Sequence, residues 1–396
     1  MERGKISVAL IFGGASDEHD VSISSARSVY EAIDKSRYTV LPIAIDRHGN
    51  WLNDEASFAL LLGKGETIPG SDKGSGAELA EKTGERYAKR TEMGYTGAGQ
   101  GENTESRYGE RIEAGRGVST RRSYCKKRRI VGSPLLSQAD VAFPLLHGPH
   151  GEDGTIQGYF ELLGMPYVGS GVLASAVSMD KSMMREVFRC AGLPLVPYRV
   201  FTEKDVQKNI DDVMNEIEST LSYPVFIKPA GLGSSIGISK AKSRSALQES
   251  LRTALRYDRR IVVEQGIEAR EIEIGMLGDD EPLYSVIGEI IPANEFYDYE
   301  AKYASSASKL IIPADLDDVQ KTRITSLAVK AYRAVRARGL ARVDFFLDTS
   351  KGDIYVNEIN TMPGFTPKSM YPLLWQASGI GYAELIDRLI THALSS

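Results

Sequence analysis

The sequence predicts a fold of mixed class, in which an α/β amino-terminal part is followed by α+β structure. An apolar run over residues 6–12 leads through Gly13-Gly14 into a helical pattern over 19–33 and then into a second apolar run over 38–45. That order is typical of a βαβ unit. Further along the chain, strand-like and helix-like segments mix without regular alternation, which indicates α+β structure.

The remaining elements are predicted from apolar runs and their spacing. We predict strands over 138–146, 167–169, 224–227, 236–239, 261–263, 340–347 and 354–360. Helical spacing covers 172–190 and returns over 382–394, where the apolar residues predict a closing amphipathic helix.

Length and composition limit the class of protein. A chain of 396 residues with 42% hydrophobic content can bury large cores, and it predicts two or three domains. The net charge of -5 gives no general reason to expect nucleic acid. Two cysteines are too few for a disulfide scaffold and suit a reducing cytoplasm. The first apolar run is too short to span a membrane, so we expect a cytoplasmic protein with no membrane partner.

The apolar pattern breaks down over residues 71–129. Between 80 and 129 the only branched aliphatic residues are Ile112 and Val118. Such a segment cannot bury enough apolar surface to offset its ordering entropy, so it predicts an irregular or disordered insert, or a corrupted stretch. The basic cluster Lys126–Arg129 could indicate nucleic-acid binding, but no aromatic platform accompanies it.

Two strands near the carboxyl end predict a cation site. Residues 340–347 and 354–360 flank a polar turn and predict a hairpin. If Leu347 lies opposite Tyr355, then Asp344 lies opposite Glu358. Side-chain alternation then places one set on a polar face, made of Arg342, Asp344, Glu358 and Asn360, and another on the core face, made of Val343, Phe345, Tyr355 and Ile359. Two carboxylates and an amide suit Mg²⁺, although the same pattern also fits a solvated hairpin face.

A glycine-rich segment joins two predicted strands. Residues 228–237 read KPAGLGSSIG. Because this loop connects strand to strand, it is neither a Walker motif nor a dinucleotide fingerprint, both of which enter a helix. Backbone amides and hydroxyls there can still cover phosphates beside the charge of Lys228, while the alternative is an ordinary mobile hairpin loop.

Two further polar segments have weaker signals. Residues 264–271 follow a predicted strand and could hydrogen-bond the base and ribose of a nucleotide, or they could be solvated carboxylates at a strand end. Residues 297–303 form a polar, aromatic loop that alone would be a surface turn.

Taken together, these segments resemble the ATP-grasp enzymes and, among them, the D-alanine:D-alanine ligases. The resemblance covers about residues 6–38 and 141–396. It depends on six phrases in the same order: Gly13-Gly14-x-Ser16-x-Glu18-His19-x-Val21-Ser22, His147-Gly148-x-x-Gly151-Glu152-Asp153-Gly154, Met179-Asp180-Lys181, Gly233-Ser234-Ser235, Tyr299-Glu300-Ala301-Lys302-Tyr303 and Asn360-Thr361-Met362-Pro363-Gly364-Phe365-Thr366.

The resemblance implies a role for each matching residue. It implies ATP binding by Lys181, Lys228, Ser235, Glu264, Ile267 and Glu271. It implies two Mg²⁺ ions, or Mn²⁺, on Asp344, Glu358 and Asn360. The first D-alanine would lie near Glu18, Val21, Ser22 and His147, and the second would place its carboxylate at Ser369 and Met370. The transferred phosphoryl group would meet Lys302, and a closing link would join Glu18, Ser234 and Tyr303.

The implied reaction forms D-alanyl-D-alanine through a D-alanyl phosphate, for peptidoglycan precursor synthesis. Alignment and charge neutralisation govern such a phosphoryl transfer. Arg342 and the Gly364 backbone N–H would stabilise the tetrahedral oxyanion. The loops 231–237 and 297–303 would close as lids, because an acyl phosphate hydrolyses in water.

The sequence also departs from the family. Apolar strands normally complete the amino-terminal sheet where residues 80–129 stand here, and His150 is an unusual choice in its phrase. Two alternatives remain open, a D-alanine:D-serine ligase and a non-catalytic nucleotide-binding protein. Tyr303 resembles the form that accepts an amine, which disfavours D-lactate but not D-serine.

The resemblance implies a three-part architecture: a Rossmann-like amino-terminal substrate domain over 1–170, then an ATP-grasp fold of two subdomains, a lid over 171–265 and a catalytic subdomain over 266–396. By analogy with related ligases, we also expect a homodimer.

Overall fold

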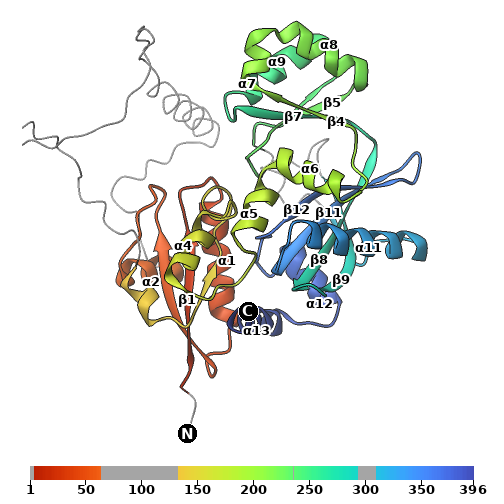
Figure 1. Ribbon diagram of the computed structural model, residues 1–396. Helices are drawn as coiled ribbons and strands as arrows, with labels where there is room; N and C mark the ends of the chain where they lie inside the picture. Colours follow the sequence, from red (N-terminus) through yellow and green to blue (C-terminus); the bar gives the residue numbers. More distant parts are fainter. Residues whose placement is uncertain (1–3, 64–132, 235, 293–308) are drawn as a thin grey trace, which may run out of the picture. The chain divides into compact units, whose positions relative to one another are not determined.

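The computed structural model describes residues 4–63, 133–234, 236–292 and 309–396. Over these residues the chain forms three sheets, and Figure 1 labels several of their strands. The segment 71–129 and the loop 297–303 lie outside the described residues. Among the residues that are described, no helix combines the length and the apolar character that crossing a bilayer requires.

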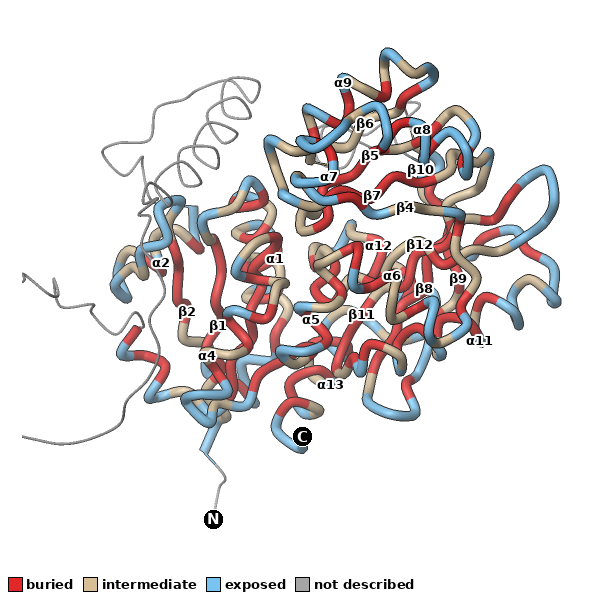
Figure 2. Tube along the Cα trace, turned by 45° about the horizontal axis from the view of Figure 1, so that its top comes forward, coloured by how far each residue is buried: buried red, intermediate tan, exposed pale blue. Residues whose placement is uncertain are grey.

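The amino-terminal sheet is parallel, with the strand order β2-β1-β3. Its strands are β1 (Ile6–Gly13), β2 (Tyr38–Ile45) and β3 (Val141–Pro144). The helices are α1 (His19–Ala32), α2 (Asp54–Leu62), α4 (Thr155–Leu163) and α5 (Val172–Met179), with the 3-10 turn η1 (Pro134–Gln138). β1 is buried along most of its length (Figure 2), as a central parallel strand should be. The predicted βαβ opening is confirmed.

Two predictions in this part are only partly right. The strand predicted over 138–146 shrinks to β3, because Ser133 caps a 3-10 turn that begins at Pro134 and occupies the chain through Gln138. The strand predicted over 167–169 is a single bridge between Tyr167 and Ala142.

A second, antiparallel sheet has the order β4-β7-β5-β6. Its strands are β4 (Tyr198–Thr202), β5 (Val225–Pro229), β6 (Ser239–Ala241) and β7 (Arg260–Gln265), and its helices are α7 (Glu203–Lys208), α8 (Ile210–Thr220) and α9 (Arg244–Ala254). Helices α8 and α9 pack against it through an apolar core that includes Ile217, Ile227 and Leu247 (Figure 1). β6 begins where the strand predicted over 236–239 ends.

The third sheet is antiparallel, in the order β10-β9-β8-β11-β12. Its strands are β8 (Ala269–Gly278), β9 (Leu283–Ile291), β10 (Lys309–Ile311), β11 (Gly339–Asp348) and β12 (Ile354–Asn360). One face packs on α6 (Lys181–Cys190) and α11 (Asp318–Ala334) in a core that includes Phe188, Ile272, Ile324 and Val343.

The other face of this sheet receives α12 (Met370–Ala377). The approach is close enough that a Cβ at Gly288 would lie 2.8 Å from Leu374 Cδ2. The chain ends in α13 (Tyr382–Ser395), the closing amphipathic helix that the sequence predicts. Its apolar side, including Leu385 and Leu389, shares a core with β1 and α1.

A β-bulge shapes the hairpin of β11 and β12. Asp344 lies opposite Glu358 as predicted, but Phe345 pairs with Val356, so Asn357 is an extra residue on β12. The prediction that Leu347 lies opposite Tyr355 is therefore wrong, because Leu347 pairs with Ile354. The bulge also places Val356, and not Tyr355, in the core.

The helical stretch predicted over 172–190 divides into two helices at Asp180. The Asp180 backbone is extended, and its side chain accepts hydrogen bonds from the backbone N–H groups of Ser182 and Met183. Asp180 thus ends α5 and caps the start of α6. The break sets Lys181 at the first position of α6.

Candidate active site

The polar face of the β11–β12 hairpin is assembled as the sequence predicts. Arg342 donates from Nε and Nη2 to the two Asp344 oxygens, at 2.7 Å each. Asn360 donates from Nδ2 to Asp344 Oδ2 at 2.8 Å. With Glu358 opposite Asp344, two carboxylates, one amide and one guanidinium share this face.

Arg342 has a second anionic partner that lies on β8. Its Nε is 2.9 Å from Glu273 Oε2, and only 4% of Glu273 is exposed. Burial alone would lower the pKa of Arg342, but the charges of Asp344 and Glu273 outweigh it and raise that pKa well above its usual value. Arg342 therefore stays a cation in this setting.

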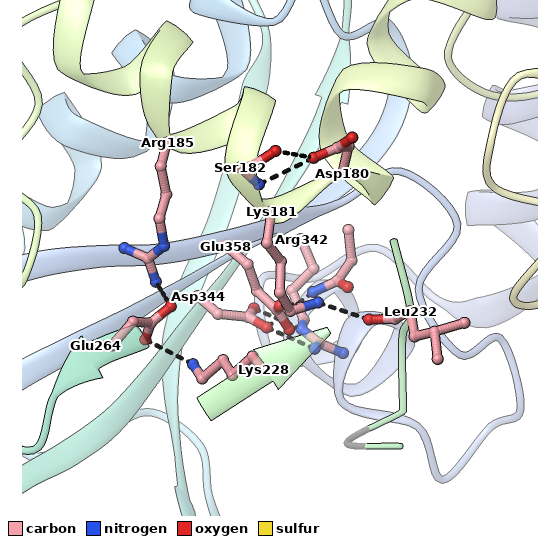
Figure 3. Close-up of polar contacts among 11 residues, drawn as sticks. Asp180, Lys181, Ser182, Arg185, Lys228, Leu232, Glu264, Arg342, Asp344 and Glu358 are labelled. Carbon is pink, nitrogen blue, oxygen red and sulfur yellow. Dashed lines mark hydrogen bonds and ion pairs between the residues drawn. The ribbon is translucent and has the colours of Figure 1, made fainter. Parts of the chain in front are cut away.

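Lys181 connects the start of α6 to the hairpin (Figure 3). Its Nζ lies 3.6 Å from Glu358 Oε2 and donates to the Leu232 carbonyl at 2.9 Å. Leu232 belongs to the glycine-rich loop, and Lys181 also donates its backbone N–H to Ala230 O at 2.8 Å. Lys181 thus contacts both the predicted phosphate loop and the predicted metal face.

A buried ion-pair chain holds the second lysine (Figure 3). Lys228 on β5 lies 2.7 Å from Glu264 Oε2, and Glu264 also pairs with Arg185 of α6. Only 1% of Arg185 and 2% of Glu264 are exposed. Burial raises the pKa of Glu264, but Arg185 and Lys228 oppose it more strongly and hold the pKa below its usual value. The carboxylate is therefore ionised and fixes the ammonium of Lys228.

The donor set of the hairpin fits a divalent cation. Asp344, Glu358 and Asn360 offer hard oxygens, which Mg²⁺ prefers, and they leave coordination positions for substrate phosphates and water. In the described part of the chain, no group of three or more His, Cys, Asp or Glu side chains forms a complete metal site.

A second polar cluster gathers around His147. Its buried Nδ1 lies 3.2 Å from Met362 O and 3.5 Å from Glu152 Oε1, while no described residue pairs with Nε2. Burial lowers the pKa of His147. The hydrogen bond to Glu152 and the charge of Glu18 raise the pKa by more than burial lowers it, so the net shift is upward. A buried imidazole with one unmatched nitrogen is a fitting contact for a polar substrate.

Glu18 lies beside this cluster. It is 8% exposed, and a Cβ at Gly148 would lie 3.2 Å from Glu18 Oε2. Val21, one turn further along α1, is half-buried. Ser22 is fully buried, and its hydroxyl accepts from Gly13 N and donates to Leu145 O. The Ser22 hydroxyl therefore ties α1 to the ends of β1 and β3.

The loop before α12 holds the residues implied for the second D-alanine. Ser369 immediately precedes α12, and its Oγ is 2.8 Å from Thr366 Oγ1 and 3.1 Å from Thr366 N. Met370 is the first helical residue, with a buried side chain. A Cβ at Gly364 would lie 3.1 Å from Ser369 Oγ, so this backbone passes close to that hydroxyl.

The other predicted residues have varied positions. Ser234 has a left-handed backbone with φ 52° in the glycine-rich loop. Ile267 is half-buried between β7 and β8, and Glu271 is half-buried on β8. Ser235, Lys302 and Tyr303 lie outside the described residues.

Three site residues have no assigned role in the sequence analysis. Arg185 lies four residues after Lys181, so helical spacing could have placed both on one face. Glu152 lies in a matched phrase, five residues after His147. Glu273 lies two residues after Glu271 and therefore on the same face of β8, but its position beside Arg342 depends on the pairing of β8 with β11, which local sequence does not predict.

Comparison with known proteins agrees with this geometry. A family model described as D-ala D-ala ligase N-terminus matches residues 7–170, and one described as D-ala D-ala ligase C-terminus matches residues 187–391. The D-alanine–D-alanine ligase of Acetivibrio thermocellus is 44% identical over 391 residues, which cover 98% of this chain and 96% of that protein. The D-alanine–D-alanine ligase of Geobacillus kaustophilus is 45% identical over 390 residues, with 98% and 95% covered.

Solved structures of ligases also resemble this chain. The VanG D-Ala:D-Ser ligase from Enterococcus faecalis has a TM-score of 0.71 at 31% identity, covering 98% of this chain and all 100% of that chain. The D-alanine-D-alanine ligase from Coxiella burnetii has a TM-score of 0.71 at 30% identity, with 99% and 95% covered. The predicted fold class and the predicted family are both confirmed. The chain belongs to the D-alanine–D-alanine ligase family.

Proposed function

We propose that this protein uses ATP to join two D-alanine molecules into D-alanyl-D-alanine for peptidoglycan precursor synthesis. The observation that supports this most strongly is the meeting of Lys181 from α6 with Glu358 of the β11–β12 hairpin, where Arg342 and Asp344 also lie. This arrangement brings a phosphate-binding cation and a metal-binding face together in a chain of the ligase family.

The proposed reaction needs both the phosphate-binding cation and the metal-binding face. A carboxylate is a poor acyl donor, so the first D-alanine must be activated by transfer of the ATP γ-phosphoryl group to its carboxylate, with release of ADP. The amine of the second D-alanine then attacks the acyl phosphate, and phosphate leaves. The transfer brings two anions together, so positioning and charge neutralisation supply most of the acceleration.

We assign the nucleotide to the side of the site that holds the two lysines. Lys181 and Lys228 bind phosphate oxygens as point charges, and Glu264 keeps Lys228 in place through the 2.7 Å pair. Ser235 adds a phosphate contact. Glu264, Ile267 and Glu271 take the base and ribose.

We assign Mg²⁺, with Mn²⁺ as a substitute, to the three oxygen donors of the hairpin: Asp344, Glu358 and Asn360. When bound, two such ions would screen the charge on the ATP phosphates. The residues themselves hold and orient: Arg342 and Asn360 fix Asp344 by hydrogen bonds, and Lys181 stands beside Glu358.

The first D-alanine belongs at the His147 cluster. Glu18 supplies an anion for its ammonium group, the unmatched Nε2 of His147 supplies a polar contact, and Val21 on the same helix lies near its side chain. Ser22 acts by holding α1 in place, since its hydroxyl is engaged by Gly13 and Leu145. His147 also contacts Met362 O, which connects this cluster to the loop that contains Gly364.

The second D-alanine places its carboxylate at the start of α12. Backbone N–H groups at a helix amino terminus attract anions, and the Ser369 hydroxyl and Met370 N–H stand there. Arg342 and the Gly364 N–H stabilise the oxyanion of the tetrahedral intermediate. We assign Lys302 to the transferred phosphoryl group, and Tyr303, together with Ser234 and Glu18, to the closing of the site.

The wider assignments follow from the family to which the chain belongs. We propose the domain limits 1–170, 171–265 and 266–396, a cytoplasmic location where ATP is available, and a homodimer. Exposed apolar side chains support the last proposal: Leu162 at the end of α4 is 88% exposed and Leu173 on the adjacent α5 is 59% exposed.

Release of phosphate measured with ATP and D-alanine tests the proposal, with D-serine and D-lactate as competing second substrates. We expect release that requires D-alanine, together with formation of D-alanyl-D-alanine. The similarity to a D-Ala:D-Ser ligase makes D-serine the main alternative, and a mixed product that exceeds D-alanyl-D-alanine would favour it. Nucleotide binding without any release would instead indicate a non-catalytic protein.

A further inference from the structure

Three carboxylates lie in a row across neighbouring strands of the five-stranded sheet. Glu273 on β8 is the register partner of Asp344 on β11, and Asp344 is the register partner of Glu358 on β12. Like charges directly opposite each other destabilise a sheet, the more so when they are buried. Glu273 and Asp344 are 4% and 8% exposed, so their repulsion must be offset by a nearby positive charge.

Arg342 neutralises one end of the row. Its Nε lies 2.7 Å from Asp344 Oδ1 and 2.9 Å from Glu273 Oε2, and its Nη2 lies 2.7 Å from Asp344 Oδ2. One guanidinium thus serves two carboxylates from adjacent strands.

Asp344 has two competing tasks in this arrangement. Both of its oxygens accept from Arg342, and Oδ2 also accepts from Asn360. A cation bound at Asp344 withdraws negative charge from those oxygens and repels the guanidinium, so it weakens the contact between Arg342 and Asp344. Glu273 then remains as the anion beside the guanidinium.

We propose that Glu273 is a positioning residue that retains Arg342 beside the reaction centre while Asp344 turns to the metal. The inference depends on the proposed function, in which Arg342 stabilises the oxyanion and Asp344 binds Mg²⁺. Glu273 itself touches neither substrate nor metal. Without it, Asp344 is the one carboxylate among the described residues that forms an ion pair with Arg342, and the guanidinium and the cation compete for Asp344.

The same sheet provides a matched control. Arg270 and Glu289 form a bidentate pair at 2.9 and 2.7 Å, and Glu289 is 7% exposed. Glu289 is the register partner of Ile272, so it lies on the opposite face from Glu273. Glu289→Gln therefore removes a buried carboxylate charge from the sheet without touching Arg342.

The test measures Mg²⁺ binding apart from turnover. The melting temperature is followed against MgCl₂ at saturating ATP with no D-alanine, and kcat is measured separately. For Glu273→Gln we expect the Mg²⁺ midpoint to rise about tenfold, the scale of one charge-assisted hydrogen bond. We expect kcat to fall on the order of 10- to 100-fold from misplacement of Arg342. Glu289→Gln should leave both within about twofold of wild type.

A double variant separates this role from direct metal binding. In Arg342→Met/Glu273→Gln, no guanidinium competes for Asp344, so the Mg²⁺ midpoint should return to the wild-type value or below it. A midpoint that stays as high as in Glu273→Gln would make Glu273 a metal ligand and overturn the proposal. An unchanged midpoint or an unchanged kcat in Glu273→Gln would overturn it as well.

Two further measurements keep the outcome readable. The melting temperature without ligand shows whether Glu273→Gln folds. If it does not fold, Glu273→Asp is used instead, because it keeps the charge on a side chain one methylene shorter. In that variant, the absence of any rise in the Mg²⁺ midpoint would overturn the proposal. Failure of the proposed function would be detected by a different measurement, because the wild-type protein would then show no D-alanine-dependent release of phosphate.

Discussion

Lys181 Nζ lies 3.6 Å from Glu358 Oε2, although the two residues come from a helix start and a strand separated by much of the chain. The break in the helix at Asp180 sets Lys181 at the amino terminus of α6, and the hairpin register sets Glu358 opposite Asp344. The pair therefore brings together the phosphate-binding and metal-binding parts of the proposed site.

Glu358→Ala should abolish turnover. It removes one of two carboxylates from the proposed Mg²⁺ site, and loss of several kcal/mol of charge stabilisation corresponds to at least about a 100-fold fall in kcat. Steady-state phosphate release measures this. Glu384→Ala, which removes an exposed pair with Arg388, serves as the control and should retain activity. Wild-type rates in Glu358→Ala would refute the metal assignment.

Lys181→Met should raise the KM for ATP by about 10- to 100-fold, because it removes a charge-assisted contact to a phosphate oxygen. ATP titration of the initial rate gives the value. Lys330→Met, at an exposed lysine of α11 that donates to Gly192 O, should leave the KM unchanged. Equal KM values in Lys181→Met and wild type would remove Lys181 from the ATP site.

The contribution of Glu264 to stability should depend on pH. Arg185 and Lys228 hold the folded-state pKa of Glu264 below its ordinary value of 4.5, even though burial acts in the opposite direction. The stabilisation from ionised Glu264 is therefore fully present above pH 4.5 and is lost as the pH falls through the lowered folded-state pKa.

Urea unfolding of wild type and Glu264→Gln at several pH values measures this effect. The difference in unfolding free energy should be constant between pH 7 and 5 and should shrink below pH 4.5. A difference that persists unchanged into the acid range would contradict the assignment of the stabilisation to the carboxylate charge.

Gly148→Ala should impair use of D-alanine. Gly148 has φ 74°, and an added Cβ would lie 3.2 Å from Glu18 Oε2, so the substitution displaces the proposed ammonium-binding carboxylate. We expect the KM for D-alanine to rise roughly tenfold or more, in line with misplaced binding groups.

Gly164→Ala separates this effect from backbone strain. Gly164 has φ 61° with nothing within 4 Å of an added Cβ, so its substitution carries the left-handed penalty of about 1–2 kcal/mol alone. It should lower the melting temperature and leave the KM for D-alanine unchanged. Equal effects of the two substitutions on KM would remove the special role of Gly148.

Leu173→Glu should convert the proposed homodimer to a monomer, because a buried charge at an apolar interface is costly. Light scattering after size-exclusion chromatography gives the mass. Leu283→Glu, at an exposed leucine of β9, should leave the mass unchanged. A wild-type protein that elutes as a monomer at all concentrations would refute the homodimer.

Contacts between residues close in the sequence were predicted more accurately than contacts between distant strands. The pairing of Asp344 with Glu358 agrees with the prediction, although the assumed pairing of Leu347 with Tyr355 is wrong, because the extra residue Asn357 shifts the register by one position between them. The position of Glu273 could not be predicted, because β8 reaches β11 only through the pairing of distant strands. The division of α5 from α6 was missed because the apolar spacing continues across Asp180, although the Asp180 side chain can cap a helix.

The extra residue on β12 allows one short strand to serve two environments. Ile354 and Glu358 are four positions apart, and strict pleating would aim both the same way. With Asn357 inserted, the first half of β12 seals the hydrophobic interior and the second half supplies a carboxylate to the hairpin's polar face. Deleting Asn357 would force either Val356 out of the core or Glu358 off the polar face, so the β-bulge allows β12 to pack into the core and still place a carboxylate beside Asp344.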